Sequence, residues 1–163
     1  MKKFLLLLLL ISVIPALTGF AYSPIDSRVA NSVGQLYIPS QNINEPIYFS
    51  KLEDGQWDRS VWDNGNVAWL DQTGWIDTDF NTVLVSHTDG PLHDIIWLAI
   101  GDIIYISDDN YVATYSVIST VIQDYSDLSA TYQSGGPKMS MTICFGDNQR
   151  YTVQAERISI ESH

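Results

Sequence analysis

Two short runs of alternating or β-branched residues near the C-terminus constrain the fold of this chain more than any other stretch. Residues 139–144 (MSMTIC) and 150–158 (RYTVQAERI) both have the pattern of strands. Only residues 145–149 separate them, which predicts a hairpin. The first run ends at Cys144, the only cysteine, and the second begins at Arg150. The hairpin would therefore place a thiol and a guanidinium at the same end of two adjacent strands.

The rest of the chain also favours β-structure, since it is rich in Tyr, Trp, Ile and Val. Further strands are predicted at residues 34–39, 81–87, 103–106 and 111–122, and a strand or a helical turn at 47–49. Residues 91–101 have helical spacing and predict one or two helical turns. The pattern of residues 51–79 is irregular. Residues 123–138 predict a long polar loop, and loops of this length are commonly functional or disordered.

The N-terminus has the pattern of an export segment. Two lysines precede an apolar run, and small residues follow it, so residues 1–21 predict a signal peptide or an uncleaved membrane anchor. Residues 22–32 are predicted to be a linker and residues 33–163 a single domain. Either form of the N-terminal segment places the domain outside the cytoplasm, with membrane contact only through that segment.

The charge balance excludes one class of partner. Eight Lys and Arg against 19 Asp and Glu give a net charge of −11, and without Lys2 and Lys3 the remainder carries 8 − 2 = 6 cations. A chain this acidic repels nucleic acid, so we exclude nucleic-acid binding. Lys138, Arg150 and Arg157, three of those six cations, lie close to Cys144 in the sequence. Positive charge favours the thiolate form of a cysteine.

A single cysteine in an exported chain has three interpretations. It is a reactive thiol, it forms an intermolecular cross-link, or it is an inert buried residue. A reactive thiol needs a proton-handling partner and a donor for the oxyanion that forms during acyl transfer. His87 follows a predicted buried strand and Arg150 opens the strand after Cys144, so these two residues are the candidates.

Both partners have alternatives that the sequence leaves open. His87 could cap loop backbone groups at a strand end, and Arg150 could blunt a strand edge. Arg157 is a rival for the role of Arg150, but its odd offset places it on the opposite face of a regular strand.

Two other groups of residues could serve a site. Trp57, Trp62, Trp69 and Trp75 could line a ligand cleft, although we favour the interpretation that they anchor loops. No metal site or cofactor is predicted, because one cysteine and dispersed histidines form no ligand cluster. Several aspartates could bind calcium near loops, but an acidic surface explains them better; these are Asp102, Asp108, Asp109, Asp124 and Asp127.

Four segments in order resemble one known family, the sortases, which are cysteine transpeptidases of bacterial cell surfaces. Residues 34–48 (GQLYIPSQNINEPIY) resemble the opening strands of that family, and residues 81–90 (NTVLVSHTDG) resemble the strand that ends in its catalytic histidine. Residues 92–106 resemble the turn and strand that follow. Residues 140–153 (SMTICFGDNQRYTV) resemble the family's TLxTC strand and the arginine after it.

The resemblance implies a mostly β fold, a closed eight-stranded barrel with short helical turns. It also implies that Cys144 is the nucleophile, His87 the acid and base, and Arg150 the oxyanion donor. The expected reaction cleaves an LPxTG-like sorting signal through a thioacyl enzyme and transfers it to an amine of a cell-wall precursor or a pilin lysine. The expected partners are surface proteins that carry a C-terminal sorting signal.

The chain departs from the family at the predicted substrate-binding positions. Ser86 precedes the histidine where the family usually has glycine, and Ile143 precedes the cysteine where the family has threonine. Together with Thr142, these residues are predicted to shape the substrate groove. Two other classes of protein fit the sequence less well. An L,D-transpeptidase is disfavoured because position 146 is glycine instead of arginine, and a non-catalytic exported β-barrel module would have an inert Cys144.

Overall fold

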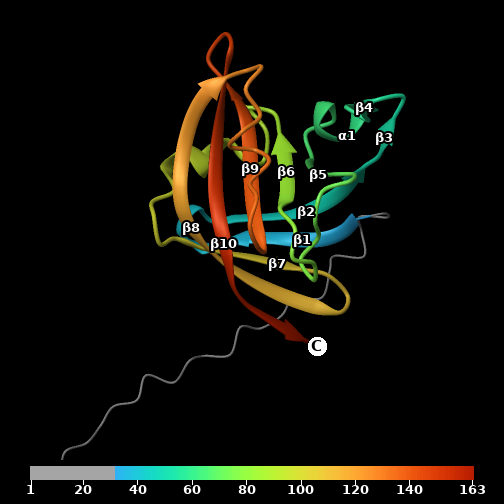
Figure 1. The fold of residues 1–163 in the computed structure, drawn as a ribbon, viewed down its shortest axis with the longest axis vertical. Coiled ribbons are helices and arrows are strands. Elements are labelled where there is room, and N and C mark those ends of the chain that lie inside the picture. Colours follow the sequence, from blue (N-terminus) through green and yellow to red (C-terminus); the bar gives the residue numbers. More distant parts are fainter. Residues whose placement is uncertain (1–31) are drawn as a thin grey trace, which may run out of the picture.

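The computed structural model describes residues 32–163, which form a closed barrel of eight strands (Figure 1). The strand order around the barrel is β1-β2-β5-β6-β9-β10-β8-β7. The strands are β1 (Ser32–Ile38), β2 (Ile43–Ser50), β5 (Val67–Leu70), β6 (Thr82–Ser86), β7 (Ile103–Ser107), β8 (Tyr111–Asp124), β9 (Lys138–Phe145) and β10 (Gln149–Ser162). This architecture confirms the predicted mostly β fold and closed eight-stranded barrel.

Short elements fill the connections between these strands. They are η1 (Pro39–Gln41), β3 (Leu52–Glu53), β4 (Gln56–Trp57), α1 (Ser60–Asp63) and η2 (His93–Trp97). Strands β3 and β4 pair with each other in a separate two-stranded sheet, and Figure 1 shows this sheet and α1 together at one edge of the barrel. None of the helices within residues 32–163 is long and apolar enough to cross a membrane.

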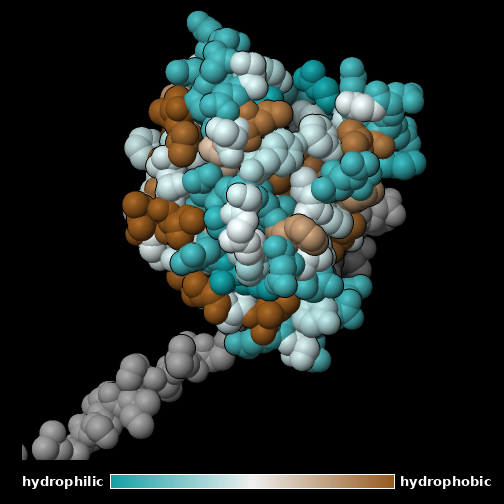
Figure 2. All heavy atoms as spheres, in the orientation of Figure 1, coloured by the Kyte–Doolittle hydropathy of each residue, from teal (hydrophilic) through white to brown (hydrophobic). Residues whose placement is uncertain are grey.

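Alternation along the strands builds the core. On β9, Met139, Met141 and Ile143 are buried inside the barrel, as are Tyr151, Val153 and Ala155 on β10. On the face seen in Figure 2, hydrophilic side chains predominate and hydrophobic ones lie in separate patches, which agrees with the acidic composition.

The register of three neighbouring strands places the site. Strand β9 lies between β6 and β10, pairing in parallel with β6 and antiparallel with β10. Ser86 is level with Ile143, so the next residues, His87 and Cys144, lie at the same level. Arg150 is the pairing partner of Cys144 across the predicted hairpin.

The segment predicted to be irregular is the main correction to the element assignments. Residues 51–79 contain β5, a strand of the barrel, besides β3, β4 and α1. Strand β5 has only four residues, and Val67 and Ala68 are both fully buried, so it shows no alternation. Strand β2 is also longer than predicted: it begins at Ile43, directly after Asn42, which has a left-handed φ of 53°.

Three of the four tryptophans of this region anchor loops, which is the interpretation that the sequence favoured. Their indole N–H groups fix loops: Trp57 donates to Asp71 O (3.1 Å), Trp69 to Gly74 O (2.9 Å) and Trp75 to the Asp108 carboxylate (2.8 Å). Trp57 and Trp62 also line a cavity. The predicted export segment (residues 1–21) and most of the predicted linker (residues 22–31) lie outside the described residues, whereas Ser32 already belongs to β1.

Candidate active site

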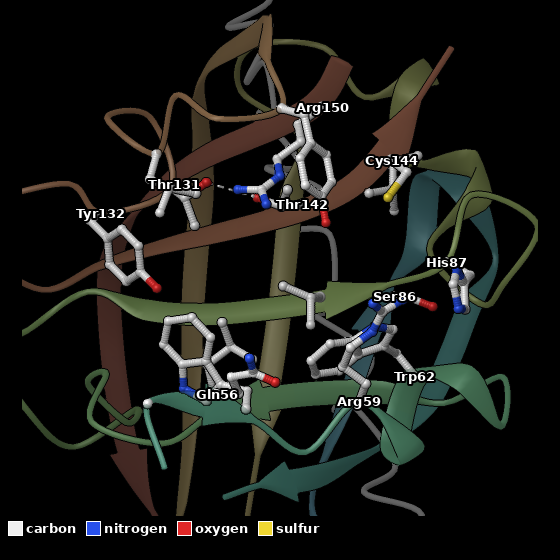
Figure 3. Close-up of a pocket in the computed structure, with 17 residues that line it drawn as sticks. Gln56, Arg59, Trp62, Ser86, His87, Thr131, Tyr132, Thr142, Cys144 and Arg150 are labelled. Carbon is white, nitrogen blue, oxygen red and sulfur yellow. Dashed lines mark hydrogen bonds between the residues drawn. The ribbon is translucent and has the colours of Figure 1, made fainter. Parts of the chain in front are cut away.

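Cys144, His87 and Arg150 line one cavity on the outer face of β6, β9 and β10 (Figure 3). Strand order and register bring them together, because parallel or antiparallel partners at one level face the same side of a sheet. The central strand carries Cys144, with His87 on one side and Arg150 on the other. The structure therefore brings the three predicted catalytic residues to one end of one groove.

The cavity has a volume of about 390 Å³ and two walls made by loops. Its floor includes Val85 and Thr142 from β6 and β9. One wall comes from the loop between β8 and β9, namely Tyr125, Leu128, Thr131 and Tyr132. The other wall comes from β4, α1 and their flanks, namely Gly55, Gln56, Trp57, Arg59 and Trp62. The groove is thus open at Cys144 and lined by aromatic and polar side chains.

The Cys144 thiol is free and exposed, and no described residue forms a hydrogen bond with it. Its backbone, in contrast, is fixed. The Thr88 hydroxyl donates to Cys144 O, and His93 Nδ1–H donates to Thr88 O at 2.7 Å. The end of β9 is therefore fixed to the loop after β6, which keeps the thiol beside the loop that carries His87.

His87 is held by a carboxylate that the sequence analysis did not single out. His87 Nε2 lies 2.8 Å from Asp63 Oδ1, and because a carboxylate accepts, Nε2 carries the proton of this hydrogen bond. Helix α1 presents Asp63. Its first turn is fixed by Asp58, whose Oδ1 accepts the Ser60 N–H at 3.0 Å, and hydrogen bonds from Ser60 lower the pKa of Asp58.

Sequence pattern could not find this pair. Asp63 lies 24 residues before His87, in the irregular segment, and no spacing rule links the two positions. The side chains of His87 and Asp63 are 38% and 45% exposed, so solvent screens the ion pair that they would form. We therefore assign Asp63 an orienting contact with the imidazole and no large contribution to stability.

Arg150 directs its charge toward the loop that forms one wall. Its guanidinium carbon lies 4.1 Å from the ring centre of Tyr125, a cation–π contact. Burial raises the pKa of the Tyr132 hydroxyl, and the positive charge of Arg150 acts in the opposite direction. The positive charge of Arg150 therefore acts on both Tyr125 and Tyr132 in this wall of the groove.

Arg157, the rival candidate, lies elsewhere. It does not line the cavity, and its NH1 group donates to the carbonyl oxygens of Ile76 and Thr78, the second at 2.9 Å. Its side chain is only 12% exposed. Arg157 thus anchors the loop between β5 and β6.

Replacing this anchor should lower stability without affecting the cavity. In Arg157→Ala two backbone carbonyls lose a charged donor, a change worth about 2 kcal/mol of unfolding free energy. Urea unfolding followed by tryptophan fluorescence measures the loss. Lys138→Ala is the control, because it removes a cation whose hydrogen bond to Ser134 O is exposed. Its free energy of unfolding should lie within about 0.5 kcal/mol of that of the parent protein.

The loop between β8 and β9 is tied to the barrel by side-chain amides. Asn81 Nδ2 donates to Thr131 O at 2.6 Å, Gln154 Nε2 to Ala130 O at 3.0 Å, and Gln133 Nε2 to Met139 O at 2.9 Å. Such bonds, made to backbone groups across the loop, give it a defined conformation. This wall of the groove is therefore formed before any ligand binds.

The three predicted substrate-binding residues occupy different environments. Thr142 lies on the floor, under the loop, with its hydroxyl 3.0 Å from that of Thr152. Ile143 is 1% exposed and belongs to the core, so it reaches the cavity only at its edge. Ser86 is also buried, and a Cβ built on Gly90 would lie 2.5 Å from its Oγ, so glycine at position 90 leaves room for this serine.

No cation site emerges beside these residues. Within residues 32–163, no group of three or more His, Cys, Asp or Glu side chains is placed to hold a metal ion.

Comparisons with known proteins agree with this geometry. The family model described as the sortase domain matches residues 36–158. The chain therefore belongs to the sortase family, the transpeptidases of bacterial cell surfaces. A search of curated protein sequences returned no match.

Solved structures share the fold at low sequence identity. Sortase E1 from Streptomyces coelicolor is 20% identical, with a TM-score of 0.71 over 81% of this chain and 91% of that chain. Sortase C-3 from Streptococcus pneumoniae is 23% identical, with a TM-score of 0.68 over 85% and 67%. Sortase A from Listeria monocytogenes is 18% identical, with a TM-score of 0.66 over 82% and 92%.

Proposed function

We propose that this sortase cleaves an LPxTG-like sorting signal through a thioacyl enzyme on Cys144 and transfers the acyl part to an amine. One observation carries the proposal: Cys144 lies at the end of a peptide-sized groove, with Arg150 on one neighbouring strand and His87 directly after the other. An accessible thiol flanked by a proton carrier and a fixed cation suits acyl transfer.

The first half-reaction breaks the scissile amide. The Cys144 thiolate attacks the carbonyl carbon and forms a C–S bond, and the carbonyl electrons move onto oxygen. The Arg150 guanidinium stabilises this oxyanion. When the intermediate collapses, the C–N bond breaks, and protonated His87 gives its proton to the departing amine. The products are a thioester on Cys144 and the free C-terminal part of the signal.

The second half-reaction is the reverse with a different amine. A neutral amine attacks the thioester carbon, and His87 accepts the proton that the amine loses. Collapse expels the Cys144 thiolate and leaves a new amide. The acceptor amine would belong to a cell-wall precursor or a pilin lysine, and the donor would be a surface protein with a C-terminal sorting signal.

Asp63 would act through His87 in both steps. Its bond to Nε2 fixes the orientation of the ring and leaves Nδ1 as the nitrogen for proton transfer. This is a positioning role, because Asp63 contacts the imidazole and does not itself line the cavity. Residues 1–21 would deliver the domain to the cell surface and hold it there if they remain attached.

Supplying peptide and amine together tests the function. The purified protein would be incubated with a panel of peptides in which positions of an LPxTG-like motif vary. Triglycine or a lysine derivative would be added as the acceptor amine, and mass spectrometry would identify the products. We expect a joined peptide–amine product that Cys144→Ala does not form. If no peptide of the panel is joined or hydrolysed and no thioester forms on Cys144, the proposal is wrong and the non-catalytic module is the better description.

A further inference from the structure

A second cavity of about 390 Å³ lies next to the first and shares Tyr132 with it. Its lining includes Gln72, Thr73, Phe80, Asn81 and Gln133. None of these side chains is charged, so the cavity differs from the first, which holds Arg59, His87 and Arg150. The catalytic residues lie outside it, and nothing described so far assigns it a role.

The two cavities lie along the same strand. Asn81 immediately precedes β6 and His87 immediately follows it, so six residues separate the second cavity from the catalytic end of the groove. At the rise of an extended chain this separation is about 20 Å. Figure 3 places Tyr132 at the end of the first cavity away from Cys144 and His87, which is the end where the second cavity adjoins it.

The walls of the second cavity are fixed. Gly74 N–H donates to Asn81 O at 2.7 Å, and a Cβ at position 74 would lie 2.5 Å from Phe80 O, so glycine permits this close approach. On the opposite side, Asn81 and Gln133 bond to the loop and to β9. The cavity is therefore a formed feature of the fold.

Its chemistry suits a neutral peptide with a large apolar side chain. Phe80 is 72% exposed and Tyr132 39% exposed, and both rings border the cavity. The Tyr132 ring also stacks on Trp57 of the first cavity, with ring centres 6.3 Å apart. The Trp57–Tyr132 pair thus connects the two cavities, and Phe80 adds a further aromatic side chain to the second one. Aromatic residues are enriched as anchors in recognition surfaces.

The direction of the bound peptide follows from the proposed reaction. The acyl part must stay bound while the leaving amine departs and the acceptor enters, so the acyl part takes the groove that leads from Cys144 toward Tyr132. With the threonine carbonyl of an LPxT segment at Cys144, the leucine lies three residues upstream of that threonine. If the peptide is extended, the residue about six positions upstream of the threonine reaches the level of Asn81.

We propose that the second cavity binds the two or three residues that precede the sorting motif and that it prefers a large apolar or aromatic side chain among them. The inference rests on the proposed function and extends its substrate specificity beyond the motif. Because this contact lies far from the scissile bond and is the same in ground and transition states, it should lower KM and leave kcat unchanged.

Peptides of two lengths test the inference. One set carries the motif alone, and the other carries three added upstream residues in which phenylalanine replaces glycine at each position in turn. We expect phenylalanine at one position to raise kcat/KM about tenfold through KM. Phe80→Ala should lose this gain and keep the rate for the short peptide, and Phe80→Tyr should restore most of it. Trp97→Ala removes an aromatic side chain of similar exposure outside both cavities and should keep the gain.

Three outcomes are informative in different ways. Equal kcat/KM for short and extended peptides in the parent protein overturns the inference and leaves the proposed function intact. A gain that survives in Phe80→Ala also overturns it, because the upstream residues then bind elsewhere. If no peptide of either length acylates Cys144, the proposed function fails, and the inference fails with it.

Discussion

Arg150→Ala is expected to fold normally and to lose about 10²–10³ in kcat, the range found when one oxyanion donor is removed. The reason is geometric: Arg150 pairs with Cys144 across the β9–β10 hairpin and lines the cavity, whereas Arg157, the other arginine of β10, does not line it. Steady-state transpeptidation of the best peptide measures the loss, and the unfolding midpoint shows whether the fold is kept.

Arg157→Ala is the matched control for this experiment. It removes the other arginine of β10, whose guanidinium binds loop carbonyls away from the cavity. We expect reduced stability and unchanged kcat. The opposite pattern, with Arg150→Ala tolerated and Arg157→Ala inactive, would reverse the assignment of the oxyanion donor.

His87→Ala is expected to lower kcat by about 10²–10⁴, the usual contribution of a positioned general acid and base. Both half-reactions need a proton to move at the scissile nitrogen, and His87 is the only histidine that lines the described cavity. Single-turnover measurement of thioester formation and of its aminolysis would show the loss in each step. A loss in neither step would make His87 a structural residue of the loop.

Asp63 variants separate orientation from proton transfer. Asp63→Ala removes the partner of Nε2 and should reduce kcat about tenfold, because a half-exposed contact contributes less than the acid itself. Asp63→Asn keeps an acceptor oxygen and should recover most of the rate. Equal losses in the two variants would show that the charge of Asp63 matters and its hydrogen bond does not.

The sequence predicted the parts of the barrel where pattern and structure coincide. Strands β8, β9 and β10 alternate over many residues, so the hairpin that pairs Cys144 with Arg150 could be recognised directly. The end of β6 was also visible, because three apolar residues precede Ser86 and His87. In contrast, β5 was missed because it has only four residues, and the two consecutive buried residues at its start give no alternating pattern.

The catalytic site, like the barrel, was predictable only in part. Residues at strand ends could be placed, and family resemblance gave them roles, whereas contacts made by loops could not be derived. The hydrogen bond that His87 donates to Asp63 depends on how α1 packs beside β6, and the second cavity depends on how two loops meet around Tyr132. Contacts between loops are set by tertiary packing, which residue propensity and residue spacing do not predict.

The central claim is that Cys144 is an activated nucleophile, and thiol labelling tests it most directly. The purified protein and His87→Ala would be treated with a methanethiosulfonate across a range of pH, and intact mass would follow the single cysteine. The account predicts fast single labelling of the folded protein, slowed in His87→Ala. Labelling that occurs only after unfolding and is unchanged by the substitution would contradict it and mark Cys144 as a structural residue.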